Sequence, residues 1–164
     1  MDRIRFVLFE LPARVGNALS WLPVLVARVA VGWTFMQTGW GKLHDLGKVI
    51  DFFRELGIPH PEIQAPFVAS VELTCGTLLL VGLLSRVAVL PLVGTMVVAI
   101  ATAQWENVGS AGDLYGLTEF LYIVIFLWVA GSGAGPVALD PYVERWLARD
   151  RAAAAPVPSA RSFA

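Results

Sequence analysis

The stretch Pro66 to Leu84, PFVASVELTCGTLLLVGLL, is long and apolar enough to cross a bilayer as a helix. It carries a single carboxylate, Glu72, in its interior. A charged side chain in hydrocarbon is costly, so an acidic residue in a spanning helix usually faces the interior of a bundle and marks a functional site or a fixed ion pair. The stretch therefore predicts a membrane helix bundle that supplies a polar partner for Glu72.

The overall composition also indicates a membrane protein. Of the 164 residues 57% are hydrophobic, and the mean hydropathy is +0.67, which is more apolar than a single soluble domain of this size can bury. A net charge of -1 without a dense basic block argues against a nucleic-acid interface. The single cysteine, Cys75, excludes an internal disulfide and a cysteine pair for thiol chemistry within the chain.

Four apolar runs approach the roughly 20 residues that a membrane helix needs; they are Leu22–Trp40, Pro66–Leu84, Val87–Trp105 and Leu117–Gly131. In lipid each run must be helical, because an isolated strand would leave its backbone groups without hydrogen bonds. The predicted fold is all-α, an integral membrane four-helix bundle with short interfacial helices. Nothing indicates a cleaved signal peptide, so the first span is expected to be a retained anchor.

Three segments are predicted around these spans. Residues 1–20 form a cytoplasmic interfacial segment, a short amphipathic helix kinked or split at Pro12, with a loose tail as the alternative. Residues 21–141 form the four-span domain. Residues 142–164 comprise a cytoplasmic amphipathic piece and a tail, disordered from Arg151 onwards because it is rich in Ala, Pro and Ser.

The distribution of basic residues predicts the orientation. If the N-terminus is cytoplasmic, more basic residues fall in the inner segments, namely Arg3, Arg5, Arg14, Arg86, Arg145, Arg149, Arg151 and Arg161. The outer segments then hold Lys42, Lys48 and Arg54. The positive-inside rule places both termini in the cytoplasm and the chain in a bacterial-type inner membrane.

A polar surface inside the bundle is the candidate site, and its members are Arg28, Glu72, Glu119, Gln37 and Lys42. Arg28 either pairs with Glu72 in the interior or extends to the headgroups of the inner leaflet. By helical rise, about 10 Å of depth separates the Cα atoms of Arg28 and Glu72. Glu119 lies near the outer end of the fourth span and is either part of this surface or hydrated. No catalytic residue can be named.

Small residues and loop residues complete the prediction. Gly32 and Gly39 on the first span and Gly76 on the second allow close helix packing. A helix from Leu46 to Leu56, with Asp45 as its N-cap, either covers a site or rests on the outer leaflet. His44 and His60 lack Cys or close His partners, so no metal site is predicted.

Several motifs together resemble the DoxX family of small four-span membrane proteins. They are Arg28-x3-Gly32-x6-Gly39-x2-Lys42, Leu56-Gly57-Ile58-Pro59-x-Pro61, Glu72 with Gly76, Gly82-Leu83-x2-Arg86, and Gly133-x-Gly135-Pro136-x2-Leu139-Asp140. Many members carry a His at the position of Thr38, so a proton or metal role of that His is absent here. The resemblance implies similarity to membrane subunits of quinone-linked oxidoreductases.

These observations favour one function and leave two alternatives. The favoured function is an anchor or membrane subunit of a redox complex, in which the Arg28 and Glu72 region is structural or lines a quinone-sized cleft; quinone comes from the resemblance. The alternatives are a scaffold for non-redox membrane proteins and an oligomeric transporter of small solutes. The expected partners are the bilayer, other membrane or redox proteins and, in an oligomer, further copies of the chain. Catalysis by this chain alone is not expected.

Overall fold

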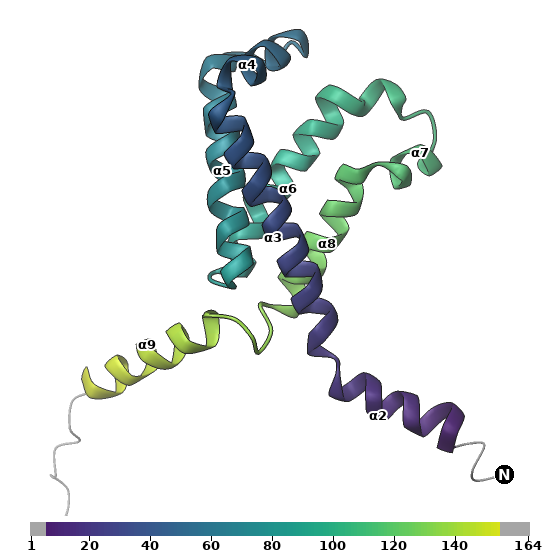
Figure 1. The fold of residues 1–164 in the computed structure, drawn as a ribbon, viewed down its shortest axis with the longest axis vertical. Helices are drawn as coiled ribbons and strands as arrows, with labels where there is room; N and C mark the ends of the chain where they lie inside the picture. Colours follow the sequence, from purple (N-terminus) through teal and green to yellow (C-terminus); the bar gives the residue numbers. More distant parts are fainter. Residues whose placement is uncertain (1–5, 155–164) are drawn as a thin grey trace, which may run out of the picture.

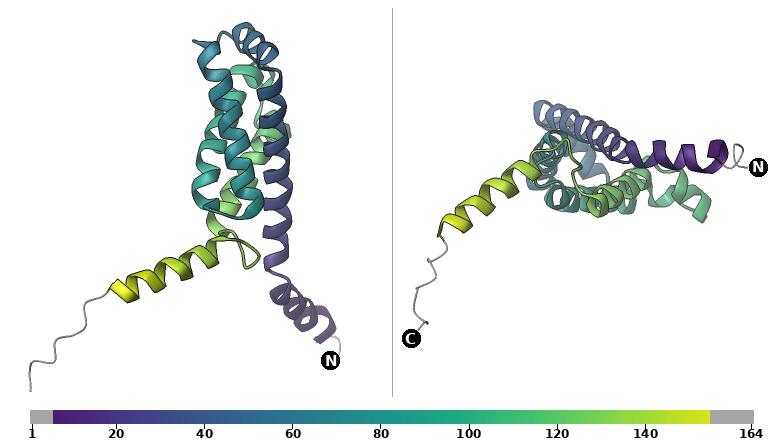
Figure 2. Two further views of the ribbon diagram at one scale, coloured as in Figure 1. Left: turned by 60° about the vertical axis from the view of Figure 1, so that its left-hand side comes forward. Right: turned by 90° about the horizontal axis from the view of Figure 1, so that it is seen from below.

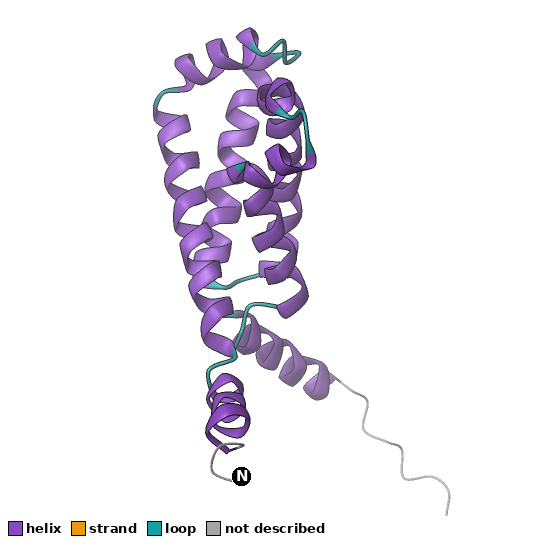
Figure 3. Ribbon diagram, turned by 90° about the vertical axis from the view of Figure 1, so that its right-hand side faces the viewer, coloured by secondary structure: helices purple, strands orange, loops and turns teal. Residues whose placement is uncertain are grey.

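The computed structural model of the chain describes residues 6–154, and within that range the regular elements are all helical (Figure 3). The bundle consists of α3 (Trp21–His44), α5 (Pro61–Val81), α6 (Ser85–Ala99) and α8 (Thr118–Ser132) (Figures 1 and 2). At its C-terminal end α6 continues as a π-helical turn, η2 (Ile100–Gln104), and a 3-10 turn, η3 (Trp105–Asn107). The prediction of an all-α membrane bundle is confirmed.

Length and hydropathy single out the helices that can cross a membrane. Helix α5 and the continuous helix Ser85–Asn107 each qualify, and the bent pair Leu8–Ala18 and Trp21–His44, which meet at 49°, qualifies when taken together. Helix α8 is apolar but has 15 residues, about 22 Å of helix, against a hydrocarbon core of about 30 Å. The described residues therefore contain two or three qualifying helices, and the fourth span stays a prediction.

Glycines set the packing of α3 against α5. A Cβ on Gly32 would lie 2.7 Å from the backbone nitrogen of Leu80. A Cβ on Gly39 would overlap the backbone of Leu73, and one on Gly76 would overlap the backbone of Met36. The two backbones are thus in direct contact, which only glycine allows.

Helices α6 and α8 complete the core. Its largest fully buried side chains include Phe126, Leu79 and Leu92. Phe35 packs edge-on against Tyr122 and Phe126, with ring centroids 5.1 Å apart in both pairs. Cys75 belongs to the same core at 9% exposure, which suits a small hydrophobic side chain.

Shorter helices lie at the two ends of the bundle (Figures 1 and 2). Helices α4 (Leu46–Glu55) and α7 (Ala111–Gly116) lie at one end, and η1 (Phe6–Glu10), α2 (Leu11–Ala18) and α9 (Asp140–Ala154) project from the other. The predicted kink at Pro12 is wrong: η1 continues into α2 with helical backbone angles at Glu10, and the bend of 49° lies between α2 and α3, because a proline in the first turn of a helix leaves no hydrogen bond unmade. Helix α7 was not predicted, although Ser110 and Asp113 form a capping box that is a start signal for a helix.

Two local predictions need correction. Asp45 precedes α4 but makes no side-chain cap; its carboxylate instead pairs with Lys48. Helix α9 extends through residues 151–154, so the tail is not disordered from Arg151, because the Ala-rich stretch favours helix. Residues 1–5 and 155–164, with the predicted roles of Arg3, Arg5 and Arg161, lie outside the described residues.

Candidate functional site

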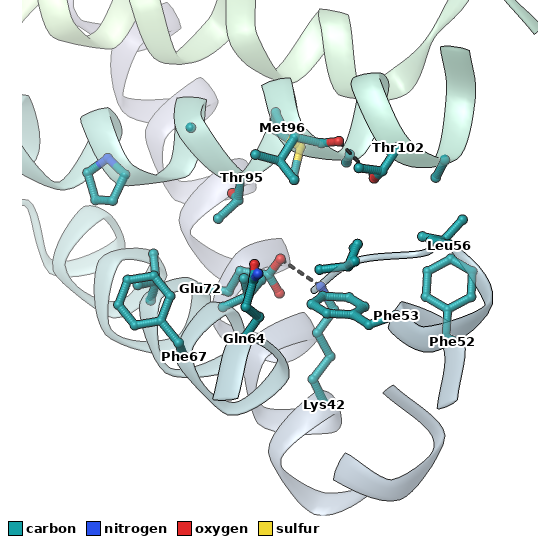
Figure 4. A pocket seen from close by; sticks show the side chains of 18 residues that line it. Lys42, Phe52, Phe53, Leu56, Gln64, Phe67, Glu72, Thr95, Met96 and Thr102 are labelled. Atoms are coloured by element: carbon teal, nitrogen blue, oxygen red, sulfur yellow. Dashed lines mark hydrogen bonds and ion pairs between the residues drawn. The ribbon is translucent and has the colours of Figure 1, made fainter. Parts of the chain in front are cut away.

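A cavity of about 460 Å³ lies between α5 and α6, beneath α4 (Figure 4). Its walls are mainly apolar side chains, among them Phe52, Phe53, Leu56, Phe67, Val71 and Met96. Small-molecule sites in proteins have this character, a mostly apolar cavity with a few polar groups that orient the ligand. The polar groups of the wall therefore decide what the cavity can bind.

The charged part of the wall is an ion pair between Lys42 and Glu72 (Figure 4). The Nζ of Lys42 donates a hydrogen bond to Oε1 of Glu72 at 2.7 Å. The side chain of Glu72 is 2% exposed and that of Lys42 is 28% exposed. Within residues 6–154, Oε2 of Glu72 is buried without a hydrogen-bond partner, which is uncommon for a buried carboxylate oxygen and marks this residue as functionally interesting.

The glycine contacts explain why these two side chains meet. Lys42 lies three residues after Gly39 on α3 and so shares its face. Gly39 touches the backbone of Leu73, the residue next to Glu72. The close approach of α3 and α5 thus places the ammonium group of Lys42, in the last turn of α3, beside the carboxylate of Glu72.

The remaining polar groups of the wall are already engaged as donors. The hydroxyls of Thr95 and Thr102 donate to the carbonyls of Leu92 and Val98 in their own helix. The Gln64 amide donates to the carbonyl of Pro59 at 2.7 Å. Lys42 has three N–H groups and uses one of them on Glu72, and the Gln64 amide has two and uses one, so these two side chains keep donors for a ligand.

One wall of the cavity includes an irregular turn. Thr102 and Ala103 line the cavity from the π-helical turn η2. Such turns are rare, and they occur frequently at functional sites. Nothing in the sequence analysis pointed to this turn, because its hydropathy is that of an ordinary span.

Helix α4 covers one end of the cavity. Phe52 and Phe53 of α4 line it, as does Leu56 beyond its end (Figure 4). Arg54 holds α4 to α5, since its guanidinium donates to Glu62 at 2.9 Å as well as to Asp51 at 2.7 Å. The hydrogen bond to Glu62 raises the pKa of Arg54, which stays charged. Of the two interpretations of this helix, the cover over a site is the one that its contacts favour.

Arg28 neither pairs with Glu72 nor extends to the headgroups, the two alternatives that the sequence left open. It is 2% exposed, so it does not extend to the surface. Its Nη1 donates to the carbonyl of Ala134 at 3.0 Å and its Nη2 to that of Val137 at 2.6 Å. The alternative of a pair with Glu72 is wrong, because Glu72 pairs with Lys42 and the Arg28 guanidinium bonds to carbonyls of the segment after α8, at the other end of the bundle.

The surroundings of Arg28 explain two of the glycine-containing motifs. Gly82 has φ +73°, and a Cβ there would overlap the Arg28 guanidinium. The Gly82 carbonyl accepts from the backbone N–H groups of Leu139 and Asp140. The Asp140 carboxylate in turn accepts from the N–H groups of Leu84 and Ser85. Arg28 therefore fastens the segment after α8 to α3, and the hydrogen bonds of Gly82 and Asp140 fasten the same segment to the α5–α6 turn.

The other predicted members do not join the ion pair. Gln37 is exposed on α3, and Glu119 is half-buried in the first turn of α8. Neither forms a side-chain hydrogen bond or ion pair within the described residues. In the same range there is no cluster of three His, Cys, Asp or Glu side chains suited to a metal ion.

The sequence analysis offered a cleft at Arg28 and Glu72 as one possibility, and the structure has a cavity that Glu72 lines with Lys42 in place of Arg28. A signal for the true partner was present, since Lys42 was among the predicted polar residues and lies in the last turn of its helix. No sequence signal indicated the other lining residues, because the walls come from four helices and from an irregular turn.

Comparison with known proteins agrees with this architecture. The sequence model of the DoxX family matches residues 23–105. The chain is 34% identical over 133 residues to an uncharacterized membrane protein of Mycobacterium tuberculosis, covering 71% of this chain and 78% of that protein. It is 30% identical over 121 residues to a Bacillus subtilis protein named "Putative oxidoreductase CatD", covering 73% and 85%. No solved structure matches significantly. The chain belongs to the DoxX family.

Proposed function

We propose that the protein is a membrane subunit of a quinone-linked redox complex and that the cavity beside Lys42 and Glu72 holds the quinone ring. The observation that carries this proposal is an ion pair with a buried carboxylate in the wall of an apolar cavity between two helices that can span a membrane. An apolar ring with polar edges matches both features of the wall. The name of the Bacillus subtilis relative, an oxidoreductase, supports a redox role.

The residues of the cavity fit a quinone ring. Quinone carbonyls are hydrogen-bond acceptors, and Lys42 retains N–H donors to meet them. Glu72 holds the ammonium group in place through Oε1, and its unpartnered Oε2 is an acceptor for a proton. Phe53 and Ile58 exclude water from the outer end. A bound quinone would supply a carrier of two electrons and two protons.

A subunit is proposed because this chain lacks a second redox group. Thiol chemistry through a quinone needs paired cysteines, and the sequence has only Cys75, which is buried in the core. Electrons would therefore come from a partner protein.

We further propose that the chain has four spans, namely α3, α5, α6 with its continuation, and α8. It lies in the bacterial inner membrane with both termini in the cytoplasm. The excess of basic residues in the inner segments supports this orientation.

Quinone binding to the purified protein in lipid nanodiscs tests the proposal. With decylubiquinone as the probe, Lys42→Met and Glu72→Gln should each weaken binding about tenfold, the loss of one good hydrogen bond to a charged group. Glu119→Gln is the matched control, since Glu119 does not line the cavity. Folded variants that bind as tightly as the wild type would rule out this site.

Isolation of the protein with its partners tests the second half of the proposal. Gentle detergent extraction followed by mass spectrometry should identify an oxidoreductase among the associated proteins. If the stable partners include none, the chain is better described as a scaffold for other membrane proteins.

A further inference from the structure

The cavity is too large for a ring alone. A cavity of about 150 Å³ suffices to bind benzene, whereas this cavity has about 460 Å³. A single ring beside Lys42 and Glu72 would leave most of the volume empty, and an apolar cavity gains from being filled. The remaining volume suits further apolar groups attached to the ring.

The side wall of the cavity opens toward the hydrocarbon. Among its lining residues, Phe67 on α5 is 65% exposed and Val98 on α6 is 50% exposed. Both belong to helices long and apolar enough to span a membrane, so the exposed parts of these side chains face lipid. The outer end, by contrast, is covered by α4, which Arg54 holds to α5.

Gly94 lies in this side wall at the depth of the ion pair. Glu72 is nine residues from the inner end of α5 at Val81, and Gly94 is nine residues from the inner end of α6 at Ser85. By helical rise both lie about 14 Å from the inner end. A Cβ on Gly94 would meet nothing within 4 Å, so the space beside it is open.

We propose that the ligand enters the cavity sideways from the bilayer and that its apolar chain leaves past Gly94, between Phe67 and Val98. The site then takes a ring that bears a long apolar chain, in preference to a small water-soluble ring. For the identity of the ring this inference rests on the proposed function. The route of the chain follows from the exposed side wall and the covered outer end.

A photoreactive quinone tests the route in the wild-type protein. The probe is an isoprenoid quinone with a diazirine on the second isoprene unit, added to the protein in nanodiscs and mapped by mass spectrometry. Adducts on Phe67, Val98 or their neighbours, displaced by the unlabelled tailed quinone, are the expected result. Displaced adducts on α4, at Phe52 or Leu56, would overturn the lateral route while leaving quinone binding intact. If no displaceable adduct forms, the quinone site itself fails.

Two variants sharpen the test. Gly94→Leu fills the open space of the side wall and should reduce the displaced adduct about tenfold, the effect of overfilling a binding cavity by a few methylene groups. Gly131→Leu is the matched control, an exposed helical glycine on α8 with nothing within 4 Å of its Cβ and no part in the cavity. Equal labelling of Gly94→Leu and the wild type would overturn the proposed route. Thermal unfolding of both variants checks that they are folded.

Discussion

Lys42 and Glu72 form an ion pair whose two members differ in their access to water. Glu72 is buried almost completely, whereas Lys42 keeps 28% of its side chain exposed. A charge left alone in a dry interior costs much more than one that can turn toward water. The two halves of the pair should therefore contribute unequally to stability.

Lys42→Met is expected to be the more harmful single substitution. It leaves Glu72 buried without a counter-charge, which should lower the free energy of unfolding by about 3–5 kcal/mol. Glu72→Gln should lower the free energy of unfolding less, since the ammonium group of Lys42 that it leaves unpaired is part-exposed. The double variant should be more stable than Lys42→Met alone. Unfolding in detergent, followed by circular dichroism, measures all three. Additive losses in the double variant would show that the pair is not coupled.

Arg28 donates hydrogen bonds from two guanidinium nitrogens to two backbone carbonyls. Lysine has a single nitrogen and cannot reproduce this geometry. Arg28→Lys keeps the charge but loses the planar fork that reaches Ala134 and Val137 together. The expected loss is about 1.5–3 kcal/mol, the value of one hydrogen bond to a charged group. Hydrogen exchange should become faster in residues 134–138 while the α3–α5 contact is unchanged. Unaltered exchange there would mean that the guanidinium does not hold the segment.

At the scale of helices, the contact between α3 and α5 sets the geometry of the site. Gly32, Gly39 and Gly76 bring the two backbones together, and this approach positions Lys42 beside Glu72. The glycine spacing along α3 was visible in the sequence, as was its suitability for close packing. The sequence did not show which helix packs against α3. Glycines on other helices, such as Gly94 on α6, have the same local character and pack against nothing.

Gly39→Ala and Gly41→Ala should have opposite effects on stability. A methyl group on Gly39 would overlap the backbone of Leu73, which cannot move as a side chain can, so we expect a loss of about 1–3 kcal/mol or more. A methyl group on Gly41, in the same helix, meets nothing within 4 Å, and Ala should raise stability by up to about 1 kcal/mol through helix propensity. Thermal unfolding of both proteins checks this. Similar effects of the two changes would contradict the packing.

The molecule as a whole has short helices at both ends of its bundle (Figure 2). Its basic residues are distributed asymmetrically between these ends. α2 and α9, which carry Arg14, Arg145 and Arg149, project from the end opposite to α4 and α7. Basic residues are retained on the cytoplasmic side during insertion. This asymmetry makes the proposed orientation testable with single cysteines.

Cysteine labelling should place the two ends of the bundle on opposite sides of the membrane. In a Cys75→Ser background, Gly109→Cys in the α6–α8 connection should react with a membrane-impermeant maleimide on intact spheroplasts. Ser20→Cys, between α2 and α3, should react only after permeabilisation. The reverse pattern would invert the proposed topology, and labelling of both sites in intact cells would contradict an odd number of spans between them.

The class of fold was determined by the sequence alone, because hydropathy and helix length are properties of single segments. In lipid such a segment must be helical, since its backbone N–H and C=O groups can then bond to one another. The same local reasoning located the long apolar helices and the unusual carboxylate Glu72. The partner of that carboxylate, the hydrogen bonds of Arg28 to the segment after α8 and the cavity lined by four helices were decided by tertiary structure. These features depend on which helices are neighbours and on their relative depth. A glycine or a charged residue does not by itself specify the residue it will contact, because that contact forms only when the helices pack together.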